Sequence, residues 1–203
     1  MTKGTIVLEG GAVRGLFTSG VLDYLMEKDL YLSHVIGVSA GSCNAVGYIS
    51  KQPERTRNCM IPRKEEDRYL NGIKTFVKEK SIMDMDKIFH KYPYETFPFD
   101  FDTYFSSEMS CDIVVTNCET GKAEYIAKTE DEKRMLTAVK ASCSVPVLCN
   151  PVELDGFHYM DGSLADSIPV KRAFEVGCDR VVCILTRKPE EAPTNYGKMR
   201  VLM

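Results

Sequence analysis

The stretch Gly37-Val38-Ser39-Ala40-Gly41 lies between a short apolar run, residues 34–38, and a segment with helical spacing, residues 40–50. A serine on a sharp turn from a strand into a helix is held in a strained backbone conformation with its hydroxyl exposed. Glycines two residues before and after it, here Gly37 and Gly41, leave room for such a turn. The stretch therefore predicts a nucleophile elbow with Ser39 as nucleophile, and a Gly-Ser-rich turn that caps a helix is the simpler alternative.

The chain before this stretch has the same order of elements. An apolar run at residues 5–8 leads into a glycine-rich turn, Gly10-Gly11-Ala12-Val13-Arg14-Gly15, and residues 15–28 follow with apolar side chains at helical spacing. Strands that alternate with helices of this length predict a parallel sheet with helices packed on its faces. The sequence therefore favours an α/β fold.

The glycine-rich turn does not match a nucleotide-binding motif. Ala12 stands where a dinucleotide-binding turn has its second glycine, and neither Ser33 nor His34 supplies the acidic residue expected about twenty positions on. Backbone N–H groups at a helix start, beside the positive charge of Arg14, instead suit an oxyanion hole. A surface ion pair is the other role open to Arg14. The expected oxyanion hole consists of Gly10, Gly11, Ala12, Arg14 and Gly15.

The rest of the chain contains further helix and strand patterns. Helices are expected at residues 67–79, 83–90, 131–141 and 169–176, and strands at residues 111–116, 123–127, 157–160 and 180–185, the last of them buried. Residues 92–105 are rich in aromatic side chains but interrupted by Pro93 and Pro98, so an irregular loop is expected there. No linker divides residues 1–203, which are expected to form one domain, and the abrupt end at Met203 leaves open a truncated C-terminus.

The composition limits the partners and the compartment that we expect. A net charge of -3 gives no electrostatic reason to expect binding to nucleic acid. The 8 cysteines form no C-x-x-C pair and no zinc-binding pattern, so we expect reduced, mostly buried thiols, no metal and a cytoplasmic location. No apolar run approaches the roughly 20 residues that a membrane-spanning helix requires, so any contact with a membrane is expected to be peripheral.

The general base for the serine is harder to identify from the residues alone. In an α/β-hydrolase triad the histidine follows the acid along the chain, and no histidine follows Asp161. Among the 3 histidines His158 is the best placed, with Asp112 or Asp155 as its partner. Asp161, at the end of a predicted strand and followed by glycine, is the stronger candidate, because desolvation can raise the pKa of a carboxylate enough for it to act as a base. An ordinary Asp-Gly turn is its alternative.

Three motifs in this order, residues 10–15, 37–41 and 161–163, resemble the signature of patatin-like phospholipases. The flanking segments 141–146 and 167–170 are similar to that family as well, and the resemblance covers nearly the whole chain. It implies a three-layer α/β/α fold with a central, mostly parallel sheet. It also implies a substrate that is a lipid or another ester, hydrolysed through an acyl-enzyme without metal or organic cofactor.

The resemblance also implies roles for particular residues. Ser39 and Asp161 would be the nucleophile and base of a Ser-Asp dyad, and the backbone amides around Gly11 and Ala12, with Arg14 nearby, would form the oxyanion hole. The chain departs from the family pattern at two positions, which are Ala12 in place of the usual third glycine, and Ser163, after Gly162, where glycine or alanine is more usual.

Other functions stay open at this point. A catalytically weak member of the same fold could bind lipid or a partner, and a small-ester esterase or thioesterase would carry the same motifs. In a lipid hydrolase the aromatic residues 92–105 are candidates for the wall or lid of an acyl-chain pocket, and ordinary packing of a long loop is the alternative.

Overall fold

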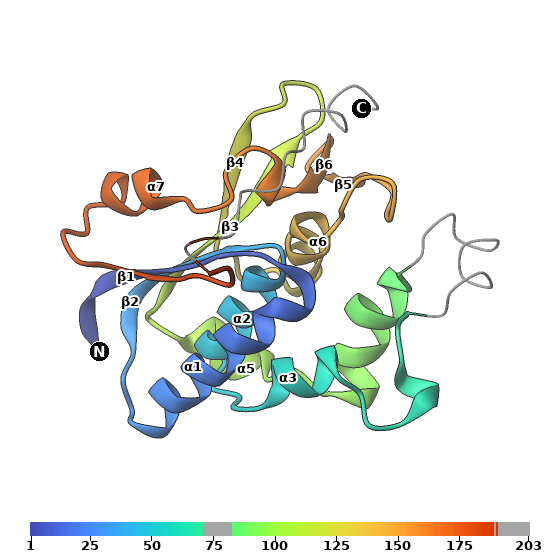
Figure 1. Ribbon diagram of the computed structural model, residues 1–203, viewed down its shortest axis with the longest axis horizontal. Helices are drawn as coiled ribbons and strands as arrows, with labels where there is room; N and C mark the ends of the chain where they lie inside the picture. Colours follow the sequence, from blue (N-terminus) through green and yellow to red (C-terminus); the bar gives the residue numbers. More distant parts are fainter. Residues whose placement is uncertain (71–82, 189, 191–203) are drawn as a thin grey trace.

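A computed structural model of the protein describes residues 1–70, 83–188 and 190 (Figure 1). The strands are β1 (Thr2–Leu8), β2 (Leu32–Val38), β3 (Ser110–Asn117), β4 (Ala123–Ala127), β5 (Val152–Leu154), β6 (Phe157–Asp161) and β7 (Val181–Ile184). The α-helices are α1 (Gly15–Glu27), α2 (Ala40–Ile49), α3 (Arg55–Met60), α5 (Phe101–Ser106), α6 (Glu132–Ser142) and α7 (Val170–Glu175). Three short 3-10 turns, η1 (Ala12–Arg14), η2 (Glu65–Asp67) and η4 (Gly162–Leu164), and a π-helix, η3 (Lys87–Thr96), complete the described elements.

The strands form one central sheet in the order β5-β6-β3-β2-β1-β7, with β4 also paired to β3. The pairs β1–β2, β2–β3 and β1–β7 are parallel, as the alternation of strands and helices predicts. The later strands β4, β5 and β6 are added in antiparallel pairs. The fold is therefore α/β with a mostly parallel central sheet, as expected.

Alternate residues of the central strands enter two different hydrophobic clusters. In β1, Ile6 and Leu8 join a large cluster with side chains of α1, α2 and α6, whereas Val7 joins a small cluster with Ala173 of α7. β2 divides in the same way, with Val35 on the first side and Ile36 on the second. Because successive side chains of a strand point to opposite faces, helices cover both faces of the sheet, and the layers are unequal (Figure 1).

One edge of β3 is shared by two strands that run toward each other. Along β3, β4 pairs with Asp112 to Thr116 and so takes one edge. On the opposite edge, the last residue of β2, Val38, pairs with Val114 in parallel. The next residue of β3, Val115, pairs with the last residue of β6, Asp161, in antiparallel. The carboxyl ends of β2 and β6 therefore meet head to head, which brings residues 39 and 161 together.

The aromatic segment is more regular than its prolines predict. The expectation of an irregular loop over residues 92–105 is wrong, because η3 continues to Thr96 and α5 begins at Phe101. Pro93 lies inside η3, which is held by burial of Phe89, Tyr92 and Pro93 itself, although proline normally ends a helical hydrogen-bond ladder.

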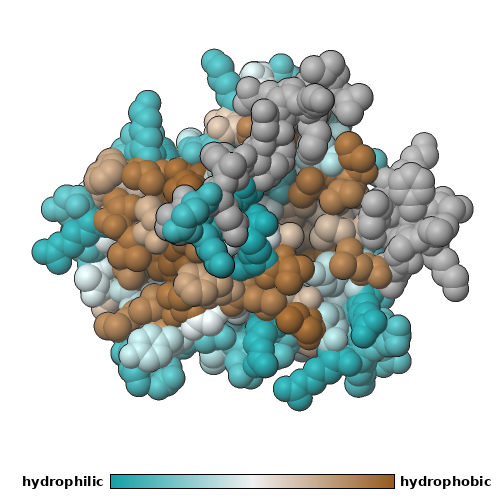
Figure 2. Space-filling view, viewed as in Figure 1, coloured by the Kyte–Doolittle hydropathy of each residue, from teal (hydrophilic) through white to brown (hydrophobic). Residues whose placement is uncertain are grey.

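Several smaller expectations also need correction. The strand at 180–185 is present as β7, but it is an edge strand with Val182 and Leu185 exposed, because it pairs with β1 alone among the described strands. Apolar residues, in brown, gather over this part of the visible face (Figure 2). The expected helix at 67–79 falls mainly outside the described residues. All eight cysteines are free, but only Cys111, Cys149 and Cys178 are buried, so the expectation of mostly buried thiols is wrong.

In 1–70 and 83–188, no helix combines the length and the apolar character needed to cross a bilayer.

The close packing of α2 on β1 yields a stability prediction. A Cβ added at Gly41 would overlap the Leu8 carbonyl oxygen of β1, whereas a Cβ added at Gly20 of α1 meets no atom within 4 Å. We expect Gly41→Ala to lower the free energy of unfolding by about 1–3 kcal/mol or more. The matched control Gly20→Ala should raise it by roughly 0.5–1 kcal/mol, because alanine suits an exposed helix interior better than glycine. Urea unfolding of both variants measures the difference, and equal effects would contradict the packing constraint.

Candidate active site

Ser39 occupies the sharp turn between β2 and α2. Its backbone has φ 53° and ψ -125°, a positive φ that a non-glycine residue adopts only under strain. A Cβ at Gly37 would lie 2.6 Å from the Gly41 carbonyl oxygen, and Gly41 itself packs on β1. Both glycines are therefore required sterically, as the elbow pattern predicts. The Ser39 side chain lies at the N-terminal end of α2, where the helix dipole is positive.

The hydroxyl of Ser39 is hydrogen-bonded to a buried carboxylate. Its Oγ donates to Asp161 Oδ2 at 2.7 Å, and both residues are buried. This contact follows from the meeting of β2 and β6 on β3. A Cβ at Gly162 would overlap the Val114 carbonyl oxygen, so the glycine after Asp161 allows the chain to turn closely against β3. A serine hydroxyl held in this way can transfer its proton to the carboxylate as it attacks a carbonyl carbon.

The second oxygen of Asp161 is held by Ser163. Asp161 Oδ1 accepts hydrogen bonds from the Ser163 amide at 2.9 Å and from the Ser163 hydroxyl at 2.7 Å. Burial raises the pKa of the Asp161 carboxyl above its ordinary value, while the hydrogen bonds from Ser163 and Ser39 oppose that rise. The residue that departs from the family pattern therefore acts directly on the carboxylate.

Ser142, at the end of α6, links the nucleophile turn to β3. The buried Ser142 hydroxyl donates to the Val114 carbonyl oxygen at 2.6 Å and accepts a hydrogen bond from the Ser39 amide at 2.9 Å. It thus fixes the backbone of the strained residue. Ser142 lies in segment 141–146, which resembles the family, but nothing in that segment indicates this role, because the contact joins residues that are far apart in the chain.

The glycine-rich turn lies against the nucleophile turn. A Cβ at Gly10 would lie 2.9 Å from the Ser39 Cβ, and a Cβ at Gly15 would lie 3.0 Å from the Ala40 Cβ. Gly11 and Ala12 both have positive φ, at 145° and 49°. The structure therefore brings the predicted turn to Ser39, with its exposed backbone between the two helix starts.

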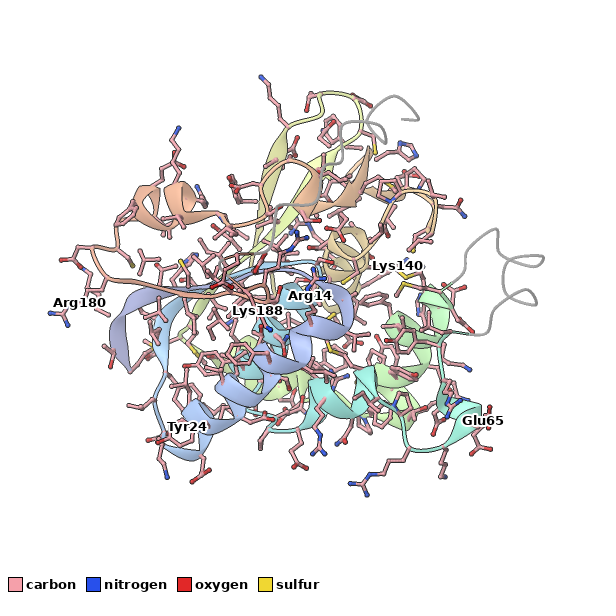
Figure 3. The ribbon with its side chains drawn as sticks, in the orientation of Figure 1. Arg14, Tyr24, Glu65, Lys140, Arg180 and Lys188 are labelled. Carbon is pink, nitrogen blue, oxygen red and sulfur yellow. The ribbon has the colours of Figure 1, made fainter. Side chains whose placement is uncertain are left out.

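Arg14 lies at the start of α1, beside the same turn (Figure 3). Its Nε would be 3.1 Å from a Cβ at Gly11, so its guanidinium lies alongside the Gly11 backbone. Arg14 is exposed, and its positive charge is therefore available at the rim of the site.

The turn is anchored by a contact that the sequence analysis missed. The buried Glu9 carboxylate accepts a hydrogen bond from the Thr186 amide at 2.6 Å, and the Thr186 hydroxyl donates to the Gly10 carbonyl oxygen at 2.6 Å. Glu9, an acidic residue directly after an apolar strand, was a visible signal, whereas nothing local marks Thr186. The segment after β7 therefore helps to hold the glycine-rich turn in place.

The hydrogen bond between Ser39 and Asp161 involves no histidine. His34 contacts Asp112, with 3.6 Å between Nε2 and Oδ2, and Asp112 also accepts a hydrogen bond from Arg172. Asp155, the other partner considered for His158, pairs with Arg134, and His158 is exposed. Within the described residues neither carboxylate is therefore paired with His158.

An apolar cavity of about 110 Å³ opens beside Ser39. Its wall includes Ala12, Ser39, Ala40, Cys43, Thr56, Cys59, Met60, Tyr69, Met83, Ile88, Phe89, Cys143 and Val145. A smaller cavity of about 50 Å³ adjoins it, shares part of this wall, and is lined further in by Tyr92, Pro93 and Phe99. Tyr92, Pro93 and Phe99 of the aromatic segment therefore form part of the wall of this smaller, inner cavity. A role as a cavity wall was one of the two expectations for this segment.

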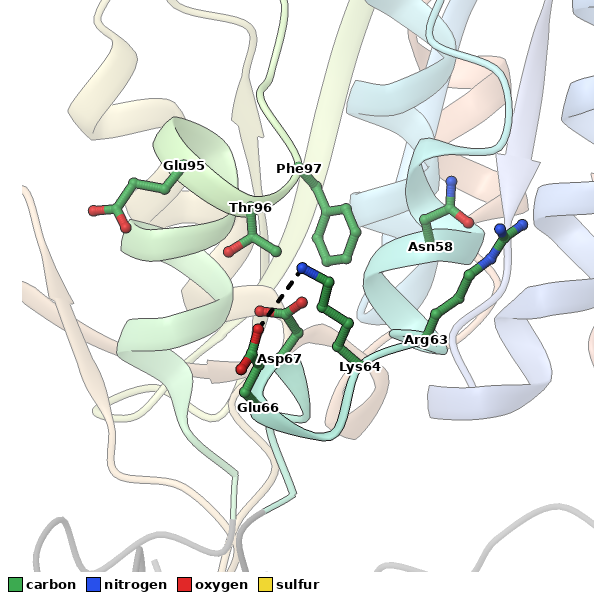
Figure 4. A pocket seen from close by; sticks show the side chains of 8 residues that line it. All are labelled: Asn58, Arg63, Lys64, Glu66, Asp67, Glu95, Thr96 and Phe97. Carbon is green, nitrogen blue, oxygen red and sulfur yellow. Dashed lines mark ion pairs between the residues drawn. The ribbon is translucent and has the colours of Figure 1, made fainter.

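A polar hollow of about 590 Å³ also contacts α3, but it has a different character (Figure 4). Its lining side chains carry both signs of charge, and Lys64 forms an ion pair with Glu66 at 3.8 Å between exposed side chains. Asn58 lines it, whereas Thr56 and Cys59 of the same helix line the apolar cavity. The apolar cavity, and not this hollow, adjoins Ser39.

Comparison with known proteins identifies the family. A sequence model of the patatin-like phospholipases matches residues 6–174. The chain therefore belongs to the patatin-like phospholipase family.

Individual relatives agree with this assignment. The chain is 30% identical over 190 residues to an uncharacterised protein of Escherichia coli K12, YjjU, covering 89% of this chain and 51% of that protein. It is 24% identical over 215 residues to patatin-like phospholipase domain-containing protein 2 of Rattus norvegicus, covering 98% of this chain and 42% of that protein. The chain spans about half the length of these curated relatives.

A solved structure shows the same fold. VipD from Legionella pneumophila superimposes with a TM-score of 0.57 at 17% identity, over 90% of this chain and 49% of that one. At 17% identity this similarity supports the fold of the chain alone.

The role of Ser142 leads to a second stability prediction. Ser142→Ala removes the acceptor of the Ser39 amide and the donor to Val114, and a buried polar group without a partner costs about 1–3 kcal/mol. We expect the free energy of unfolding to fall by at least that amount. The control is Ser144→Ala, because the buried Ser144 hydroxyl donates to the Lys140 carbonyl oxygen at the end of the preceding helix and not to a distant strand. Denaturant unfolding should show a clearly smaller loss for the control, and similar losses would count against the bridging role.

Proposed function

We propose that the protein is a serine acyl-hydrolase that cleaves fatty acyl esters, with Ser39 as nucleophile and Asp161 as general base of a Ser-Asp dyad. The observation that carries this proposal is the 2.7 Å hydrogen bond from Ser39 Oγ to Asp161 Oδ2, at a strained turn beside an apolar cavity. Membership of the patatin-like phospholipase family, whose name denotes phospholipid ester hydrolysis, supports the same reaction class.

The reaction follows from the positions of these groups. Asp161 takes the proton as Ser39 Oγ attacks the ester carbonyl carbon, and the alcohol leaves to give an acyl-enzyme. The developing oxyanion is held by the amides of Gly11 and Ala12, and by the positive end of α2. Arg14 adds positive charge at the rim. Water then attacks the acyl-enzyme, with Asp161 again accepting a proton.

The buried environment makes a carboxylate usable as this base. An exposed aspartate is a weak base for a hydroxyl, because its pKa lies near 4. Burial of Asp161 raises that pKa and so increases its proton affinity, while the bonds from Ser163 favour the ionised form. The raised pKa makes the carboxylate a stronger base for the serine proton than an exposed aspartate would be.

The cavity beside Ser39 would hold the acyl chain. Its volume of about 110 Å³ corresponds to roughly four water-sized groups, so the outer cavity suits a short acyl chain, and a longer one must also enter the inner cavity. This size also favours a second candidate function, hydrolysis of small esters or thioesters. Rates on micellar and monomeric esters of equal chain length separate the two substrates.

Exposed aliphatic side chains stand next to the cavity wall. Val13, Ile61 and Val147 are 53%, 55% and 68% exposed, and each lies within two residues of a residue that lines the cavity. Such a rim favours peripheral contact with a lipid surface, from which an acyl chain could enter. The proposed partner is therefore a lipid substrate met at an interface.

Labelling with a fluorophosphonate tests the catalytic proposal. We expect the wild type to be labelled at Ser39, because the probe requires an activated serine and an oxyanion hole. Ser39→Ala should not be labelled, and Asp161→Asn should lose ester hydrolysis, since an amide cannot accept the proton. Mass spectrometry of the labelled peptide and an ester hydrolysis assay are the measurements.

The control for this experiment is His158→Ala, which changes an exposed residue outside the site and should keep most of the activity. Absence of labelling in the folded wild type would reject the enzyme in favour of a binding protein. Loss of activity in folded His158→Ala would reject the dyad.

Ser163 gives a prediction of pH dependence. The ionised Asp161 is the active form, so the acid limb of kcat/KM follows its pKa. Ser163→Ala removes the hydroxyl bond that favours the ionised form but keeps the amide bond, so the pKa should rise. The acid limb should move to higher pH by about one to two units, since a hydrogen bond to a charged group is worth about 1.5–3 kcal/mol and one pKa unit corresponds to about 1.4 kcal/mol. Ser167→Ala is the control, because the Ser167 hydroxyl donates to the Ser163 carbonyl oxygen and not to Asp161. An acid limb at the same pH in Ser163→Ala and in the wild type would contradict the effect of the Ser163 hydroxyl on the pKa of Asp161.

A further inference from the structure

Two cysteine side chains meet in the wall of the apolar cavity. Cys43, on the second turn of α2, and Cys143, directly after α6, have their Sγ atoms 3.7 Å apart. Both line the cavity beside Ser39. The Ser42 hydroxyl is also 3.8 Å from Cys143 Sγ. Two thiols from different helices are thus in contact next to the nucleophile, and the proposed hydrolysis uses neither of them.

We propose that Cys43 and Cys143 form a peroxide-sensitive thiol site, which oxidises to a disulfide and closes the cavity beside Ser39. The sulfur atoms of a disulfide are about 2 Å apart, so the two Sγ atoms must approach by less than 2 Å. Cys143 follows the last residue of α6, and its amide is bonded to the Val139 and Lys140 carbonyl oxygens of that helix. The approach of the two Sγ atoms therefore requires a local movement of the chain at the end of α6.

The surroundings of Cys43 favour its reaction as the first thiol. Its hydrogen bond with Cys143 lowers the pKa of the Cys43 thiol, and the positive charge of Arg55 acts in the same direction, while burial opposes both. The hydrogen bond with Cys43 and burial both raise the pKa of the Cys143 thiol, so Cys43 is the stronger acid of the pair. Cys59 lines the same cavity, but burial raises the pKa of its thiol to about 11. Thiolate character therefore selects Cys43 among these thiols.

The chemistry balances with a peroxide as the only added reactant. The Cys43 thiolate attacks one peroxide oxygen, so that an S–O bond forms, the O–O bond breaks, and the leaving oxygen departs as water after protonation. Cys143 then attacks the sulfenic sulfur, an S–S bond forms, and the hydroxyl leaves with the Cys143 proton as a second water. Overall, two thiols and one hydrogen peroxide give one disulfide and two waters.

The disulfide would act on the site in two ways. It would place a covalent bridge in the cavity wall, and it would pull the residue that follows Ser142, whose hydroxyl holds the Ser39 amide. This consequence rests on the proposed role of Ser39, whereas the formation of the disulfide does not.

The experiment exposes reduced full-length protein to hydrogen peroxide, blocks the remaining thiols by alkylation, and maps linked peptides by mass spectrometry without reduction. We expect a Cys43–Cys143 linked peptide to form before the exposed thiol of Cys183 is oxidised. Fluorophosphonate labelling of Ser39 should fall in proportion to the linked peptide and return after dithiothreitol treatment. Cys43→Ser and Cys143→Ser should each prevent the linked peptide and the dithiothreitol-reversible loss.

Cys59→Ser is the matched control, because it changes a thiol of the same cavity and should leave the linked peptide unaffected. The proposal would be overturned if Cys183 is oxidised while Cys43 and Cys143 remain reduced and are recovered in their alkylated form. A linked peptide with undiminished labelling would overturn closure of the cavity. If the reduced protein is not labelled at all, the proposed hydrolase function fails, and peptide mapping still decides the thiol site.

Discussion

The whole site depends on the way in which β2 and β6 share one edge of β3. Val38 and Asp161 pair with consecutive residues of β3, so two strands of opposite direction end at the same point. The backbone of β3 then fixes the separation of Ser39 and Asp161, and neither side chain has to cross open space to reach the other. Ser142 fits at this junction because its hydroxyl connects the β3 backbone to the turn of Ser39. A parallel sheet alone would not produce this meeting of strand ends.

The electrostatics of the site reflect a balance around one carboxylate. Burial favours the neutral form of Asp161, while donors on both of its oxygens favour the charged form. Burial alone would raise the pKa of the Asp161 carboxyl further, whereas an exposed carboxylate would bind the serine proton weakly. Ser163 and Ser39 therefore matter for the charge of the group as well as for its orientation.

Local patterns in the sequence predicted the helices and strands around the site. They did not predict contacts between segments that are distant in the chain. Apolar spacing predicted the helix at 15–28, and acidic residues at its start predicted the helix at 131–141, and the structure contains α1 and α6 there. α5 was missed although Asp100, which accepts a hydrogen bond from the Thr103 amide, was a recognisable cap signal. The role of Ser142 and the anchor at Thr186 could not be found, because periodicity contains no information about which distant residues become neighbours.

The contact of Glu9 with the segment after β7 has a consequence for the biosynthesis of the protein. The turn that contains Ser39 leaves the ribosome early, its carboxylate partner follows more than a hundred residues later, and Thr186 comes later still. Because contacts of such sequence separation form slowly and only after the later segment exists, the nascent chain exposes a half-built sheet while it grows.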